Sequence, residues 1–164
     1  MRCFLDRDGV VNYDDGYVGT IKRFRWYHEI FDIMNTLKNK GYTSFVIVTN
    51  QSGIGRRYYT KESFLELSSW VEEIISKKTG ISVETRYCPH TPEDNCGCRK
   101  PKIGMFDKYL IGQDDIMIGD KSSDMLAAKR AGINRRWLIT SGEGGYHTAR
   151  FENHKELIEM LRMW

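Results

Sequence analysis

The chain has 164 residues, a length that suits a single domain (1–164) with its own hydrophobic core. It is 40% hydrophobic and 29% charged, and no apolar run approaches the roughly 20 residues that a membrane span requires. The apolar stretch before Asp6 is too short for a signal peptide, so we expect a cytoplasmic monomer that does not bind membranes. The net charge of +3 suits a small anionic ligand but is too weak to indicate nucleic acid.

Short apolar runs alternate along the chain with stretches of helical period. In chain order, this pattern predicts a strand at 3–5, a helix at 29–40, a strand at 43–48, a helix at 60–78, a strand at 82–87, a short helix at 105–110, a strand at 116–118, a helix at 122–131, a strand at 136–139, and a closing helix at 153–161. Strands that alternate with helices predict an α/β fold, a Rossmann-like, doubly wound parallel sheet with helices on both faces.

Polar side chains follow four of the predicted strands. They are Asp6 and Asp8 after the first, Thr49, Asn50, Gln51 and Ser52 after the second, Arg99 and Lys100 after the third, and Asp120, Lys121 and Asp124 after the fourth. Ligands of open parallel sheets bind outside the carboxyl ends of the strands, near the point where the strand order reverses. We therefore expect these side chains to meet at one edge of the sheet.

The three aspartates of this set suit phosphoryl transfer. Asp6 and Asp8 are separated by one residue, so an extended backbone would point both carboxylates to the same face. Together with Asp120 they would form an oxygen-rich site for a hard cation such as Mg²⁺. Asp6 could then attack phosphorus, while Asp8 protonates the leaving alcohol and later deprotonates water.

Three further residues would support this chemistry. Lys100 and the hydroxyl of Thr49 would stabilise charge on the phosphate oxygens, and Asp124 would accept a hydrogen bond from Lys100 or complete the outer shell of the metal. Taken one at a time, these residues also suit ordinary structural roles, because D-x-D after a strand is a common cap or turn. Only the ordered set at four strand ends favours catalysis.

A cysteine-rich loop predicts a second metal site. Cys88, His90, Cys96 and Cys98 form a C-x-H-x5-C-x-C pattern, and three thiolates with one imidazole complete a tetrahedral zinc site without an open position. We expect a structural zinc; ordinary loop cysteines are the alternative, and the inferred compartment disfavours disulfides. Cys3 stands apart within a predicted strand, where we expect a buried free thiol.

The motifs together resemble those of a known superfamily. The segments FLDRDGVVN (4–12), VTNQSG (48–53), RKP (99–101) and IGDK with Asp124 (118–124) are similar to the four motifs of the haloacid dehalogenase superfamily of phosphatases. Within it, they resemble the D-glycero-D-manno-heptose 1,7-bisphosphate phosphatases, with histidinol-phosphate phosphatases as near relatives. The resemblance implies Asp6 as nucleophile, Asp8 as acid/base, and Mg²⁺ held by Asp6, Asp120 and the backbone carbonyl of Asp8. The zinc loop resembles that of the same subgroup.

Substrate recognition is expected to come from loops, since the short interval between the first two motifs leaves no room for a cap domain. Residues 14–17 resemble the heptose-enzyme segment that contacts sugar hydroxyls, although an ordinary solvated turn is the alternative. The expected substrate-binding residues are Asp14, Asp15, Gly16, Tyr17, Asn50, Gln51, Ser52, Arg99 and Lys121. The run 56–59 could meet a second phosphate or lie in solvent. Residues 24–29 depart from the turn expected in the heptose subgroup.

Three functions are compatible with these features. The first is removal of the 7-phosphate from D-glycero-D-manno-heptose 1,7-bisphosphate, a small phosphorylated sugar. The second is histidinol-phosphate hydrolysis; Tyr17 and Ser52 favour the sugar. The third is a non-catalytic zinc module that binds nucleic-acid ends, which would require a basic stripe with interleaved aromatic residues, and none is present beyond 56–59.

Overall fold

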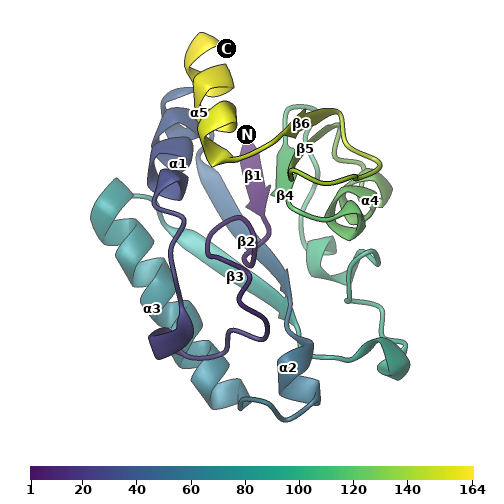
Figure 1. Cartoon of the computed structure of the whole chain (residues 1–164). Helices are drawn as coiled ribbons and strands as arrows, with labels where there is room; N and C mark the ends of the chain where they lie inside the picture. The colour runs from purple at the N-terminus through teal and green to yellow at the C-terminus, as the bar shows by residue number, and fades with distance from the viewer.

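A single sheet of six parallel strands organises the computed structural model, which describes residues 1–164 (Figure 1). The strands are β1 (Arg2–Leu5), β2 (Ser44–Asn50), β3 (Val83–Cys88), β4 (Ile116–Gly119), β5 (Arg135–Ile139) and β6 (Ala149–Phe151). Their order across the sheet is β3-β2-β1-β4-β5-β6. The order reverses between β1 and β4, which confirms the predicted doubly wound α/β fold.

Helices cover both faces of the sheet. They are α1 (Glu29–Asn39), α2 (Ser52–Gly55), α3 (Lys61–Thr79), α4 (Ser122–Arg130) and α5 (His154–Met163), with short 3₁₀ turns η1 (Ile21–Arg23), η2 (Pro92–Asp94) and η3 (Gly104–Phe106). In Figure 1, α1, α3 and α5 lie on one side of the strands and α4 on the other. None of the helices combines the length and the apolar composition that crossing a bilayer requires.

The side chains of β1 show how one apolar run serves two cores. Cys3 and Leu5 belong to the cluster that packs under α1, α3 and α5, whereas Phe4 belongs to the cluster under α4. Successive side chains of a strand point to opposite faces, so a strand covered on both sides must be apolar throughout. Cys3 is fully buried and unpaired, as expected.

The boundaries of two predicted helices lie where the local sequence indicates. Thr60 caps α3 by accepting a 3.0 Å hydrogen bond from the backbone N–H of Ser63, and Gly80 ends the helix in the left-handed conformation. Asn153 caps α5 in the same way through the N–H of Glu156, at 3.1 Å. These side chains satisfy backbone donors that the first turn of a helix leaves free.

Three short elements differ from the sequence predictions. The prediction of a helix at 105–110 is wrong, because the segment contains only the single 3₁₀ turn η3. Phe106 is buried, and its ring centroid lies 5.1 Å from that of Phe4. Leu110, in contrast, is 94% exposed, so the apolar residues of this segment do not share one helical face. The strand β6 and the helix α2 were not predicted; each has four residues or fewer.

The segment between β1 and β2 contains no cap domain. Its only helical elements are η1 and α1. The carboxyl ends of the strands therefore remain open to solvent beside the loop that joins β1 to η1.

Candidate active site

Three carboxylates meet at the point where the strand order reverses. Asp6 directly follows β1, Asp120 directly follows β4, and Asp124 lies in the first turn of α4. One oxygen of each lies within 4.8 Å of the others. Gly9 makes this approach possible, because its φ is +91° and a Cβ at this position would lie 2.2 Å from Oδ2 of Asp120.

The negative charge of this cluster is only partly compensated by its neighbours. Burial and the Asp124 carboxylate raise the pKa of Asp6 to about 6, against the opposing effect of Lys100. Burial together with Asp6 and Asp124 raises the pKa of Asp120 to about 9. Oδ1 of Asp120 is buried without a hydrogen-bond partner. An all-oxygen donor set with an unpartnered buried oxygen fits a hard divalent cation.

Lys100 compensates part of the negative charge. Its buried ammonium forms ion pairs with Asp6 at 2.8 Å and with Asp124 at 2.7 Å, and it donates to the carbonyl of Val48 at 2.7 Å. Burial disfavours the charged lysine, but Asp124 and Asp6 outweigh this and raise its pKa. For Asp124, the sequence predicted either a hydrogen bond from Lys100 or a place in the outer shell of the metal, and the structure shows the contact with Lys100.

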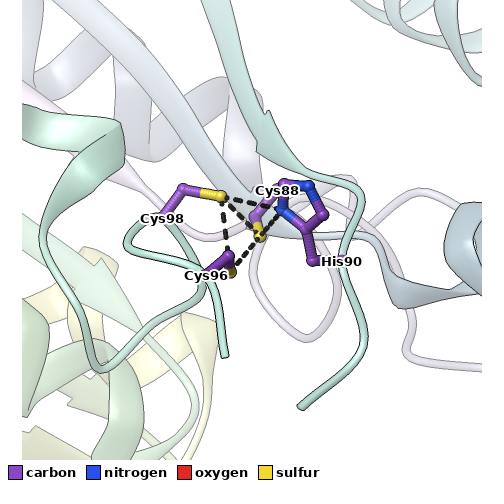
Figure 2. A group of neighbouring side chains, drawn as sticks. All are labelled: Cys88, His90, Cys96 and Cys98. Atoms are coloured by element: carbon purple, nitrogen blue, oxygen red, sulfur yellow. Dashed lines mark hydrogen bonds between the residues drawn. The ribbon is translucent and has the colours of Figure 1, made fainter. Parts of the chain in front are cut away.

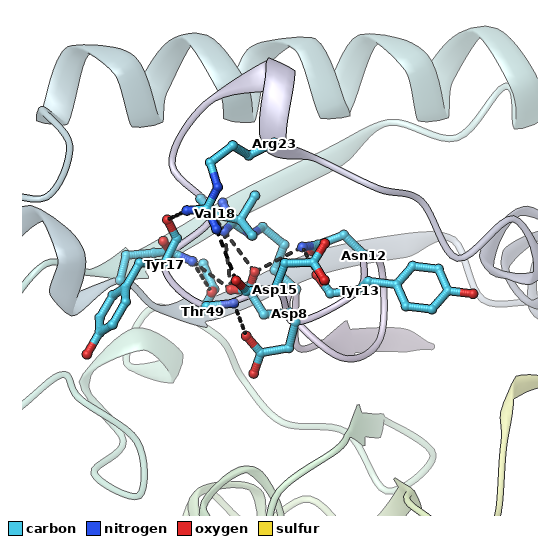
Figure 3. A network of polar contacts seen from close by, with 12 residues as sticks. Asp8, Asn12, Tyr13, Asp15, Tyr17, Val18, Arg23 and Thr49 are labelled. Carbon is cyan, nitrogen blue, oxygen red and sulfur yellow. Dashed lines mark hydrogen bonds and ion pairs between the residues drawn. The ribbon is translucent and has the colours of Figure 1, made fainter.

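The side chain of Asp8 lies outside the carboxylate cluster. It accepts hydrogen bonds from Nη2 of Arg7 (3.0 and 3.2 Å), Nδ2 of Asn12 (3.0 Å) and Nε2 of Gln51 (3.0 Å), a network shown in Figure 3. With these donors, Asp8 lines a neighbouring cavity and stays outside the cluster of Asp6, Asp120 and Asp124. The third carboxylate of the cluster is Asp124, whereas the sequence placed the Asp8 side chain beside Asp6 and Asp120.

Arg7 is a buried residue beside Asp8 that the sequence did not single out. Its side chain is 1% exposed and lies near the rings of Phe24 and Phe64, with its Cζ 6.0 and 5.7 Å from their centroids. Besides Asp8, it donates to the carbonyl of Val18. Arg7 therefore connects the D-x-D turn to the loop that follows it. Nothing in the sequence distinguishes this buried arginine from an exposed one.

A cavity of about 430 Å³ opens beside these groups. Its lining includes Asp8, Lys100 and most of the predicted substrate-binding residues, namely Asp14, Gly16, Tyr17, Asn50, Gln51, Ser52, Arg99 and Lys121. Ser123 also lines it and was not predicted, and so does Tyr59, which belongs to the run 56–59 that was expected to meet a second phosphate or to lie in solvent. Thr49 is buried behind the cavity, where its hydroxyl accepts a 2.8 Å hydrogen bond from Gln51.

Asp15 lies elsewhere. Its carboxylate forms a two-point contact with Arg25, at 2.7 and 2.6 Å, and it lines a neighbouring cavity of about 340 Å³ together with Asp120. Asp14 lines both cavities and forms a 3.0 Å ion pair with Lys121. The residues predicted to bind substrate at 14–17 are therefore divided between these two cavities.

The loop at residues 14–17 is fixed by an arginine from η1. Arg23 donates to the carbonyls of Tyr17 and Asp15, at 2.9 and 3.0 Å, and both contacts lie within the network of Figure 3. Tyr17 has a φ of +49°, an uncommon conformation for a residue with a side chain. The two hydrogen bonds hold this conformation and keep the Tyr17 side chain in the cavity lining.

The four metal-binding candidates of the cysteine loop converge. Cys88 ends β3, and the side chains of Cys88, His90, Cys96 and Cys98 face one another in Figure 2. Sγ of Cys98 lies 2.8 Å from Sγ of Cys88 and 3.3 Å from Nδ1 of His90, and all four ligand atoms lie within 4.8 Å. A three-sulfur, one-nitrogen donor set of this size is typical of tetrahedral zinc.

The cysteine loop adjoins the cavity through Lys100. The backbone N–H of Lys100 donates to the Asn50 side chain at 2.9 Å, and the Asn50 amide donates to the Lys100 carbonyl at 3.1 Å. Arg99 donates its own backbone N–H to Sγ of Cys96 at 3.4 Å. The position of these two basic residues thus depends on both β2 and the cysteine cluster.

Comparisons with known proteins agree with this geometry. A family model described as "Polynucleotide kinase 3 phosphatase" matches residues 13–132. A D-glycero-beta-D-manno-heptose-1,7-bisphosphate 7-phosphatase from Helicobacter pylori (strain J99) is 36% identical over 97% of this chain and 95% of its own length. A protein of the same name from Haemophilus ducreyi is 38% identical over 94% and 90%.

A solved structure is also similar throughout. It is a D,D-heptose 1,7-bisphosphate phosphatase from B. bronchiseptica complexed with magnesium and phosphate, with a TM-score of 0.82 and 27% identity. The alignment covers 99% of this chain and 98% of that one. Fold and sequence comparisons therefore lead to the same group of proteins.

Proposed function

Because the chain belongs to the family described as Polynucleotide kinase 3 phosphatase and to the heptose-1,7-bisphosphate 7-phosphatases, we propose a specific reaction for it. The reaction is removal of the 7-phosphate from D-glycero-D-manno-heptose 1,7-bisphosphate. The main support is the meeting of Asp6 and Asp120, which follow β1 and β4, with Lys100 from the loop after β3, beside a polar cavity. Chance seldom assembles such a set at a topological switch point.

In this mechanism Asp6 is the nucleophile. One of its carboxylate oxygens attacks the phosphorus of the 7-phosphate, the bond between phosphorus and the sugar oxygen breaks, and Asp8 gives its proton to that oxygen. Asp8 then takes a proton from water, the resulting hydroxide attacks the phospho-aspartate, and inorganic phosphate leaves while Asp6 is restored. Asp6, Asp120 and the backbone carbonyl of Asp8 would hold Mg²⁺, which when bound neutralises charge on the phosphate.

Two neighbours stabilise the phosphate during transfer. Lys100, paired with Asp6 and Asp124, directs positive charge at the site of attack. The oxygen of the Thr49 hydroxyl already accepts an N–H from Gln51, so its own proton is free for a phosphate oxygen. Both residues bind the reacting phosphate itself, which makes their contribution independent of the sugar.

We place a structural zinc ion in the cysteine loop. Cys88, His90, Cys96 and Cys98 would fill all four positions, leaving none for water or substrate. In this role the metal holds the loop that leads into Arg99 and Lys100, and takes no part in the chemistry.

The cavity is consistent with a phosphorylated sugar. Its volume of about 430 Å³ lies within the range of small-molecule sites, and its lining is mostly polar. Asp14, Asn50 and Ser52 offer acceptors and donors for hydroxyl groups, while Arg99 and Lys121 offer positive charge. The relatives include one named for the alpha anomer, from Burkholderia mallei, beside those named for the beta anomer. Both anomers therefore belong in the test.

The test is phosphate release from both anomers of the heptose bisphosphate, with fructose 1,6-bisphosphate and histidinol phosphate as competing substrates, in Mg²⁺ and in EDTA. We expect turnover of a heptose anomer that stops in EDTA. Preference for histidinol phosphate would support the proposed phosphatase chemistry but refute the heptose bisphosphate as the substrate. Failure of every phosphomonoester in the presence of Mg²⁺ would contradict the enzymatic function.

A further inference from the structure

A chain of hydrogen bonds leads from Tyr59 to the acid/base residue. The Tyr59 hydroxyl donates to Oε1 of Gln51. The other end of the same amide, Nε2, donates to Oδ2 of Asp8 at 3.0 Å and to the Thr49 hydroxyl at 2.8 Å. Gln51 is 2% exposed, so each of its polar atoms needs a partner within the protein.

Asp8 and the Tyr59 hydroxyl together fix the direction of the Gln51 amide. Both carboxyl oxygens of Asp8 accept hydrogen bonds here, so Nε2 of the amide faces Asp8 and Oε1 points away from it. Oε1 then lies buried and needs a donor, which Tyr59 supplies. Without this donor the amide would turn towards the water of the cavity to satisfy its carbonyl, because a buried carbonyl without a hydrogen-bond donor is unfavourable. Asp8 would then lose one of its four hydrogen bonds.

The fold holds the Tyr59 ring at this place. A Cβ on Gly19 would lie 2.1 Å from Cγ of the ring, and one on Gly53 would lie 2.2 Å from Cε1. Two glycines therefore bring the backbone of two separate segments against the aromatic ring. Burial raises the pKa of Tyr59 to about 12, so the hydroxyl remains a hydrogen-bond donor at neutral pH.

We propose that Tyr59 is a positioning residue, which orients Asp8 for proton transfer to the leaving sugar oxygen by fixing the amide of Gln51. The inference rests on the proposed phospho-aspartate mechanism. Its geometric basis is the continuous chain from Tyr59 through Gln51 to Asp8, with both N–H groups and the carbonyl of the amide engaged. Tyr59 acts on the reaction only through this amide.

The first test is Tyr59→Phe, measured with two substrates. With the heptose bisphosphate we expect kcat and kcat/KM to fall about tenfold with KM unchanged, the size expected for one hydrogen bond to a charged group. With p-nitrophenyl phosphate, whose leaving group departs without a proton, we expect kcat/KM to change by less than about twofold, since Asp8 gives it little help. Equal losses on both substrates, or none on the sugar, would overturn the inference.

A double-mutant cycle separates positioning from direct contact with substrate, because Tyr59 also lines the cavity. In a Gln51→Ala background, Tyr59→Phe should cause no further loss; additive losses would mean that Tyr59 contacts the sugar itself, which contradicts the proposal. Tyr42→Phe is the control, since it also removes a hydroxyl hydrogen bond, to the carbonyl of Asp114 at 3.0 Å, but Tyr42 precedes β2 whereas Gln51 follows it, and the variant should retain full activity. An inactive wild-type protein would instead refute the proposed function, which keeps the two failures distinct.

Discussion

At the residue scale, Gly9 determines where Asp120 can lie. A methyl group there would meet Oδ2 of Asp120 at 2.2 Å, and the φ of +91° already disfavours any side chain. Gly9→Ala should therefore displace a proposed magnesium ligand. We expect the Mg²⁺ concentration for half-maximal activity to rise about 10- to 100-fold, as it does when residues that orient metal ligands are changed.

Gly132→Ala is the matched control for this experiment. Gly132 has a φ of +88°, close to that of Gly9, but a Cβ there would meet no atom within 4 Å. Both variants bear the same backbone strain, and only Gly9→Ala adds the clash. An equal Mg²⁺ requirement in the two variants would show that Gly9 does not position Asp120.

Sequence motifs singled out the residues proposed to react better than the residues that hold them. Asp6 and Asp120 directly follow strands, and a strand end can be recognised from the apolar run before it. Arg7 and Tyr59 form hydrogen bonds with Val18 and Gln51, which lie across a loop or a turn of the chain. Such contacts depend on tertiary packing, which local patterns do not encode.

At the element scale, the cysteine loop should be a stabilising unit. We expect about one zinc ion per chain in the purified protein, and we expect Cys96→Ser to lose it. Loss of a structural metal is among the changes that destabilise a protein most. Each kcal/mol of lost stability lowers the Tm of a domain of this size by about 2–4 °C, and for a loss of about 2 kcal/mol or more we expect the Tm to fall by at least about 5 °C. Metal content and thermal unfolding measure the two effects.

Cys3→Ala is the control, since Cys3 is buried under α1, far in sequence from the cluster. This variant should keep its zinc. If Cys96→Ser retained both zinc and Tm, the structural role of the loop would be refuted.

Short elements were the ones that the sequence could not predict. The three residues of β6 form a strand only because Ala149, Arg150 and Phe151 pair with β5, and their own pattern is too short to show a period. The helix expected at 105–110 fails for a related reason, because Phe106 packs on Phe4 in a 3₁₀ turn. In both places, tertiary contacts outweigh local preference.

At the scale of the whole molecule, the strand order makes the site. β1 and β4 are neighbours although more than a hundred residues separate them, and Asp6 and Asp120 meet for this reason. The doubly wound sheet was predictable from the alternation of strands and helices, and the rule for parallel sheets then placed the site. The orientation of Asp8, which faces away from the cluster, depends on three donors that only the folded structure brings together.

The phospho-aspartate on Asp6 is the central claim, and it can be trapped directly. Borohydride reduces an acyl phosphate, so treating the protein during turnover of p-nitrophenyl phosphate should convert Asp6 to homoserine, identified in the peptide by mass spectrometry. Asp8→Asn should raise the trapped fraction, because the step that hydrolyses the intermediate loses its base while this leaving group needs no acid. Modification of Asp6 that requires substrate and Mg²⁺ is the predicted result. An active protein in which Asp6 stays unmodified, or in which another residue is reduced, would contradict the mechanism.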